Sequence, residues 1–149
     1  MNNSFFLVFQ NKVVIATILG WVTAQSIKIA INCIRERKFN FRWVIGTGGM
    51  PSAHSSGVMS LATAVGIQQG FDSAIFVITM VFAVVIAFDA QGVRRATGQQ
   101  AEILNKILDD IYWRRKIQED RLKELIGHTP FEVFVGSLIG IIIAALVMM

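Results

Sequence analysis

Charged residues, cysteine and proline are all scarce in this 149-residue chain. Only 16% of the residues are charged, whereas a soluble domain usually carries about 25%, which argues against an ordinary soluble globule. A single cysteine, Cys33, excludes an internal disulfide and a cysteine-based zinc site. Because 54% of the residues are hydrophobic and the length allows one domain, residues 1–149, we expect a small integral membrane protein.

Four apolar stretches can be placed along the chain. They lie at residues 13–34, 55–70, 73–88 and 131–149. About 20 apolar residues are needed to cross a bilayer core as a helix, and the second stretch is short and rich in small and hydroxylated residues. The sequence therefore predicts an all-α integral membrane bundle with about four transmembrane helices.

A charged segment at residues 99–125 separates the third and fourth stretches. Its apolar residues recur every three or four positions, which is typical of an amphipathic helix. We expect this connecting helix to lie on the membrane surface or against the bundle. The alternative is a solvated face on a plain connector.

Basic residues concentrate in two predicted loops. Residues 35–53 and 89–130 contain 12 of the 14 lysines and arginines. With four spans both loops face one compartment, and the positive-inside rule puts them in the cytoplasm. Because the basic residues flank apolar runs, we expect a multi-pass protein of the cell (inner) membrane, with no nucleic-acid partner.

One face of the first predicted helix is polar. Lys28 and Arg35 lie seven residues apart, about 10 Å of helical rise, and Gln25 and Asn32 share their face. Ionisable side chains in membrane segments usually face a polar interior or a pathway. We therefore predict that this face binds a ligand, the alternative being that Lys28 extends to the headgroups.

Residues 46–57, Gly-Thr-Gly-Gly-Met-Pro-Ser-Ala-His-Ser-Ser-Gly, lead into the second predicted helix. Pro51 favours a helix start, where backbone N–H groups attract anions. Ser52 and Ser55 add hydroxyl donors, and His54 is suited to exchange a proton with a bound group. The segment is neither a nucleotide P-loop nor a serine-hydrolase elbow. A simple capped turn is the alternative.

The ends of the third and fourth stretches carry further candidates. Arg94 and Arg95 suit recognition of phosphate oxygens, or else anchor the chain at the membrane edge. Glu132 has the spacing of a capping box, or else holds the ring of His128 in one tautomer. All these groups fall at the same-side ends of the predicted helices, which indicates a site for a phosphorylated substrate at a membrane surface.

In their order, these residues resemble the type-2 phosphatidic acid phosphatase superfamily, which includes the vanadium haloperoxidases. That superfamily has Lys-x6-Arg-Pro, then Pro-Ser-Gly-His, then Ser-Arg-x5-His-x3-Asp. Lys28 and Arg35 keep the first spacing, with Glu36 in place of proline. Residues 51–54 match the second motif with Ala for Gly, and His128-x3-Glu132 matches the end of the third with Glu for Asp.

The strings GGMPSAHS, DAQGVRRATG and GHTPFEV resemble the divergent branch of that superfamily, over residues 20–140. Leu122 occupies the position of the arginine in the third motif, so we assign that arginine's role to Arg94 or Arg95.

The resemblance implies a metal-independent phosphatase, with no cofactor, that acts on a lipid phosphomonoester of the phosphatidylglycerophosphate or phosphatidic acid type. In this mechanism His128 becomes phosphorylated, Glu132 orients its ring and His54 acts as acid and then base. The groups expected to bind the phosphoryl oxygens are Lys28, Arg35, Ser52 and one of Arg94 and Arg95. The alternative is a non-catalytic membrane protein that retains a phosphate or headgroup site.

Gly136-x-x-x-Gly140 in the fourth stretch is a spacing that allows close helix packing. It predicts tight packing of this helix or a homo-oligomer.

Overall fold

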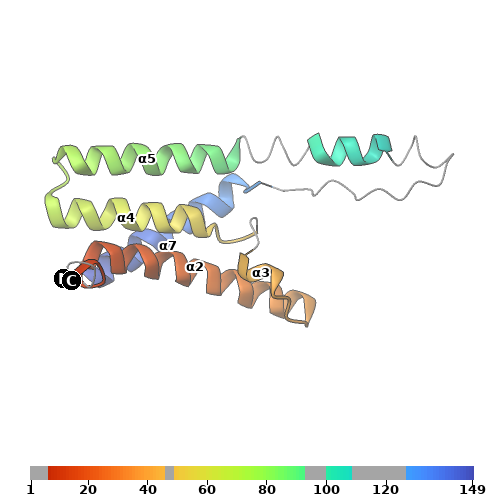
Figure 1. The fold of residues 1–149 in the computed structure, drawn as a ribbon, viewed down its shortest axis with the longest axis horizontal. Coiled ribbons are helices and arrows are strands. Elements are labelled where there is room, and N and C mark those ends of the chain that lie inside the picture. The colour runs from red at the N-terminus through yellow and green to blue at the C-terminus, as the bar shows by residue number, and fades with distance from the viewer. Residues whose placement is uncertain (1–6, 46–48, 93–99, 109–126) are drawn as a thin grey trace, which may run out of the picture.

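The computed structural model describes residues 7–45, 49–92, 100–108 and 127–149. The helices are α2 (Lys12–Glu36), α3 (Arg42–Ile45), α4 (Ala53–Gln69), α5 (Ala74–Gln91) and α7 (Pro130–Met148), as Figure 1 shows. Residues 100–108 are also helical. The predicted all-α bundle is confirmed, and the four apolar stretches correspond to α2, α4, α5 and α7.

Each long helix begins at a side chain that accepts a hydrogen bond from a backbone N–H of its first turn. The four capping residues are Asn11, Ser52, Ser73 and Thr129. Such caps satisfy N–H groups that the helix itself leaves without a partner. The caps therefore fix where each helix starts, including the two starts that carry the predicted histidines.

Helix α4 lies in the middle of the bundle and packs against α2, α5 and α7. It joins α5 through a tight turn at Gly70, whose φ of 92° favours glycine. The chain reverses direction from each long helix to the next, and both termini lie at one end of the bundle (Figure 1). The starts of α4 and α7 and the ends of α2 and α5 therefore meet at the other end, called here the site end.

Within the described residues, three helices are long and apolar enough to cross a membrane: α2, α5 and α7. The shorter α4 is more polar, and its side chains Ser55, Ser56 and Ser60 are completely buried. In contrast, α5 exposes large apolar side chains such as Ile78 (67%) and Phe88 (72%). Exposed apolar side chains are stable in lipid and not in water, so these helices form a membrane bundle with α4 enclosed among them.

Glycines let the helices approach closely at the centre of the bundle. A Cβ atom on Gly136 would collide with the carbonyl oxygen of Ser52, and one on Gly140 with that of Ser56. On the other side of α4, the Ser56 hydroxyl donates to the Gly20 carbonyl at 2.8 Å. The Gly136-x-x-x-Gly140 spacing thus packs α7 against α4 within one chain, and a homo-oligomer stays a prediction.

The predicted amphipathic helix is described only over residues 100–108. Lys106 and Glu102 form an exposed ion pair of 2.7 Å, and Ile103, Leu104 and Ile107 are exposed on the same segment. In Figure 1 the segment extends beyond the bundle from the side of α5. The part of the prediction that covers residues 109–125 lies outside the described residues.

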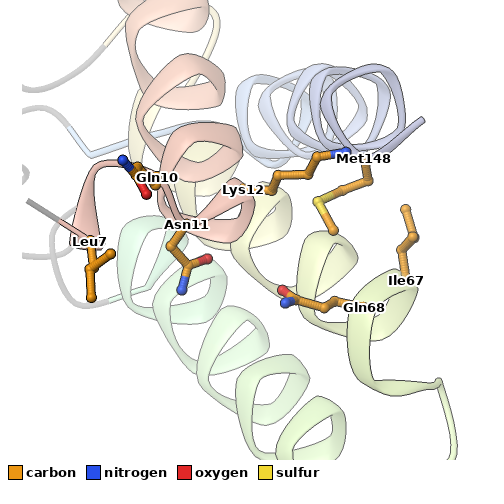
Figure 2. Close-up of a pocket in the computed structure, with 7 residues that line it drawn as sticks. All are labelled: Leu7, Gln10, Asn11, Lys12, Ile67, Gln68 and Met148. Carbon is orange, nitrogen blue, oxygen red and sulfur yellow. The ribbon is translucent and has the colours of Figure 1, made fainter.

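The end of the bundle that carries both termini contains a cavity of about 570 Å³ (Figure 2). It lies between the start of α2 and the ends of α4 and α7. Its lining residues are Leu7, Gln10, Asn11, Lys12, Ile67, Gln68 and Met148. None of the predicted site residues lines this cavity, and the starts of α4 and α7, which carry the predicted histidines, lie at the opposite end.

Candidate functional site

His128 lies at the junction between α5 and α7. Its backbone N–H donates to the carbonyl of Ala90, in the last turn of α5, at 3.0 Å. It immediately precedes Thr129, the N-cap of α7, and only 2% of the residue is exposed. The end of one helix and the start of another therefore hold this histidine inside the bundle.

The carboxylate of Glu132 serves both roles that the sequence left open. Its Oε2 atom accepts the Thr129 N–H at 2.9 Å and also lies 3.2 Å from Nδ1 of His128. The Thr129 hydroxyl accepts the Glu132 N–H in return, completing a capping box. When Nδ1 carries the proton donated to Glu132, Nε2 of His128 keeps the lone pair that a nucleophile needs.

His54 lies in the first turn of α4, two residues after its N-cap. The centroids of the His54 and His128 rings are 6.5 Å apart, and their planes are tilted by 55°. The two histidines of the chain thus face one another from the starts of two different helices. Since neutral imidazole both accepts and donates protons near neutral pH, the pair is equipped for nucleophilic and acid–base chemistry.

Ser52 connects the starts of α4 and α7. Its backbone N–H donates to the carbonyl of Glu132 at 3.1 Å, and the residue is completely buried. Its Oγ atom accepts from both the N–H and the hydroxyl of Ser55, at 3.3 and 3.0 Å. Because these bonds use the lone pairs of Oγ, the hydroxyl hydrogen of Ser52 remains as a donor.

Lys28 turns into the bundle from the middle of α2, and only 3% of the residue is exposed. A Cβ atom on Gly49 would lie 3.9 Å from its Cγ and Cδ, so its alkyl chain runs beneath the turn that precedes α4. Its ammonium interacts electrostatically with Glu132. This position differs from the alternative in which the side chain extends to the headgroups.

The structure brings five of the predicted site residues together. They are Lys28, Ser52, His54, His128 and Glu132. Arg35 lies apart, in the exposed last turn of α2, and Arg94 and Arg95 lie outside the described residues. In the described ranges, no three His, Cys, Asp or Glu side chains are grouped in a way that would hold a metal ion.

Two contributors to the site were missed by sequence reasoning. The Ala90 carbonyl positions His128, and Gly136 makes room for the backbone of Ser52. A backbone carbonyl has no side-chain signature in a sequence, so nothing pointed to Ala90. The small-residue spacing that includes Gly136 was recognised, but not the helix against which it packs.

Residues 9–143, which include every predicted site residue, match the family model described as the divergent PAP2 family. The chain belongs to the divergent PAP2 family. The predicted resemblance is thereby confirmed, and this family is related to the PAP2 proteins, which include phosphatases.

A curated relative of this divergent PAP2 chain is the "Uncharacterized membrane protein YuiD" of Bacillus subtilis (strain 168). The two are 40% identical over 140 residues, which cover 87% of this chain and 89% of the relative. No solved structure matched the chain. Together with the three apolar helices, this similarity identifies the divergent PAP2 chain as a multi-pass membrane protein.

Proposed function

We propose that this protein is a metal-independent phosphatase that hydrolyses a lipid phosphomonoester through a phosphohistidine on His128. The observation that carries the proposal is the 3.2 Å contact between Nδ1 of His128 and the carboxylate of Glu132. It leaves Nε2 as the nucleophilic nitrogen, and the ring centroids of His128 and His54 are 6.5 Å apart. Membership of a family related to phosphatases supports the same chemistry.

In the first step, Nε2 of His128 attacks phosphorus as the bond between phosphorus and the lipid alkoxide breaks. Protonated His54 donates its proton to the departing alkoxide, which leaves as an alcohol. Glu132 stabilises the positive charge that develops on the ring of His128, as an acid–histidine pair does in other enzymes. The product of this step is a phosphohistidine and a neutral His54.

In the second step, His54 removes a proton from a water molecule while the water oxygen attacks the phosphohistidine. The bond between Nε2 and phosphorus breaks, inorganic phosphate leaves and His128 regains its lone pair. His54 is protonated again, so both residues return to their starting states.

The phosphoryl oxygens are bound by Lys28 and by the hydroxyl of Ser52. Lys28 is buried within electrostatic range of Glu132, and a cation in such a water-poor site stabilises developing negative charge strongly. We also propose Arg35 and one of Arg94 and Arg95 as cations for the substrate, although Arg35 lies apart from the five clustered residues, in the exposed last turn of α2.

We further propose that the site end faces the cytoplasm, because the helix ends that flank the two predicted basic loops lie at this end. A phosphate ester made on the inner leaflet, such as phosphatidylglycerophosphate or phosphatidic acid, is then the expected substrate. The test uses single cysteines, at Thr47 and at Asp72, in a Cys33→Ser background. A membrane-impermeant maleimide added to intact cells is expected to label Asp72→Cys alone, and labelling of Thr47→Cys instead would reverse the orientation.

The activity is tested by phosphate release from purified protein in detergent with EDTA present. Phosphatidylglycerophosphate, phosphatidic acid and a polyprenyl pyrophosphate are the substrates, and His128→Asn is the control because it removes Nε2 from a residue of related shape. Release that persists in EDTA and disappears in the variant is expected. Release that is equal in both proteins would contradict the proposal.

A second candidate, a non-catalytic protein that binds a lipid headgroup, is favoured by one observation. The oxygen of Glu132 that contacts His128 is also engaged in the capping box of α7, as expected of a purely structural residue. Binding of a lipid phosphate to the folded protein, without release of inorganic phosphate, would support this second candidate.

A further inference from the structure

Three aromatic side chains gather on the chain segment that follows α2. The rings of Phe39 and Phe41 meet edge to face at a centroid distance of 5.0 Å, and those of Phe39 and Trp43 at 6.4 Å. Although they contact one another, Phe39 is 54% exposed and Phe41 is 80% exposed. Residues 37–45, called here the interfacial loop, therefore present an aromatic cluster at the surface of the site end.

Positive charge surrounds this cluster. Residues 35–42 contain four basic residues and one acidic residue, and Arg35, Arg37 and Lys38 are exposed. Arg37 ends α2 with a left-handed conformation, at a φ of 51°, which reverses the chain direction. The basic residues and the aromatic residues lie together within residues 35–43.

The interfacial loop folds back alongside α2. The side-chain amide of Gln25 donates to the carbonyls of Trp43 and Val44, at 2.8 and 3.0 Å. Gln25 lies ten residues before Arg35, which is about 15 Å of helical rise. The aromatic cluster is therefore held beside the last turns of a membrane-crossing helix, and not beyond its end.

Aromatic and basic side chains near the end of a membrane-crossing helix both favour the headgroup region of the bilayer. Aromatic residues are enriched where the hydrocarbon core meets the headgroups, and clusters of Lys and Arg attract anionic lipids. In water, the exposed rings and Ile34, which is 79% exposed, would form an unfavourable apolar patch. A second copy of the chain is a poorer partner, because it would bring two basic clusters together.

We propose that the interfacial loop inserts its aromatic cluster among the headgroups of the leaflet at the site end and concentrates anionic phospholipid there. Gln25, which holds the loop, is one helical turn from Lys28 on the same face of α2. The anionic lipid is thus gathered beside the candidate site. This proposal does not depend on catalysis by His128, and it holds equally for a binding protein.

The depth of the loop is tested with tryptophan fluorescence in vesicles. The chain has three tryptophans, and the variant Trp21→Phe/Trp113→Phe keeps only Trp43. Lipids brominated near the headgroup are expected to quench Trp43 more than lipids brominated near the chain end. The matched control, Trp43→Phe/Trp113→Phe, keeps Trp21 in the membrane-crossing part of α2 and should be quenched best by the deeper bromines.

The preference for anionic lipid is tested in mixed vesicles in which either phosphatidylglycerol or phosphatidylcholine carries the bromines. Brominated phosphatidylglycerol is expected to quench Trp43 about twofold more strongly than brominated phosphatidylcholine. In 1 M salt this difference should disappear. Around Trp21 no preference is expected. Adding Arg37→Gln/Lys38→Gln should abolish the preference while leaving the depth of Trp43 unchanged.

Two results would overturn the proposal. One is quenching of Trp43 by aqueous iodide with no quenching by brominated lipid, which would place the loop in water. The other is equal quenching by the two brominated lipids at low salt, which would remove the anionic preference. The variant Phe39→Ser/Phe41→Ser should increase the access of iodide to Trp43. The same two serine substitutions, made in the variant that keeps only Trp21, should leave the quenching of Trp21 unchanged. That result shows that the bundle remains folded.

Discussion

Glu132 contacts His128 with the same carboxylate oxygen that caps α7: Oε2 lies 3.2 Å from Nδ1 of the imidazole and accepts the Thr129 N–H at 2.9 Å. The start of the helix and the orientation of the ring are therefore coupled. The longer side chain of glutamate, in place of the aspartate of the superfamily motif, suits this double contact because glutamate is the residue that closes a capping box.

Glu132→Gln is expected to separate the two functions of this carboxylate. The amide oxygen of glutamine still closes the capping box, so the stability should change by less than about 1 kcal/mol. However, a neutral amide no longer stabilises a cationic ring, and hydrolysis should fall about 10²- to 10⁴-fold. Thermal unfolding and phosphate release measured on the same preparation test this. A variant that is fully active would show that Glu132 is only a cap.

Lys28→Met should lower kcat/KM for a lipid phosphate by about 100-fold, because it removes a buried cation from the site. The same substitution at Lys12, at the opposite end of α2, provides a matched control that should leave kcat/KM unchanged. Steady-state kinetics of both variants, measured in the same detergent, test this prediction. An equal loss of kcat/KM at the two positions would mean that removing either charge from α2 lowers activity and that Lys28 has no specific role at the site.

His54→Asn should affect substrates according to their leaving groups. A lipid alkoxide needs a proton as it departs, so its release should slow about 10²- to 10⁴-fold without the general acid. An aryl phosphate such as p-nitrophenyl phosphate releases a stable phenolate, so formation of the phosphoenzyme should slow far less. Rapid-mixing measurements of nitrophenol release report this step separately. Equal slowing for both substrates would show that His54 is not the general acid.

Gly136→Ala and Gly140→Ala should destabilise the bundle because the added methyl groups meet the carbonyl oxygens of Ser52 and Ser56. Overpacking of this kind typically costs about 1–3 kcal/mol. Ser137→Ala is the control on the same helix, since its hydroxyl donates to the carbonyl of Val133 one turn earlier. Unfolding temperatures in detergent that are the same for all three variants would contradict the close packing.

Local sequence patterns predicted the helices and the histidine pair well. The apolar stretches located α2, α4, α5 and α7 to within a few residues, because membrane helices require continuous apolar runs. His128 directly precedes the N-cap and Glu132 is the third residue of α7, so the contact forms where the carboxylate reaches back to the cap, as in a capping box. Whether Glu132 served the cap or the histidine could not be decided, because the choice depends on one oxygen atom reaching both groups.

Contacts between distant segments were not predictable in the same way. The bond from the Ser52 N–H to the Glu132 carbonyl joins backbone atoms 80 positions apart and leaves no trace in residue types. The inward turn of Lys28 places its alkyl chain near Gly49, 21 residues further along the chain. Likewise, Gln25 was identified as part of a polar face, but its bonds to Trp43 and Val44 require the chain to fold back after Arg37.

The proposed mechanism requires a covalent phosphohistidine, and the most direct measurement is to trap it. Purified protein is mixed with a lipid phosphomonoester labelled with ³²P in its phosphate, quenched with alkali within milliseconds and digested for mass spectrometry. We expect label that is stable in alkali and lost in acid, located on His128 and absent from His128→Asn. Phosphate release without any label on His128, in wild-type protein sampled throughout the turnover, would contradict the mechanism.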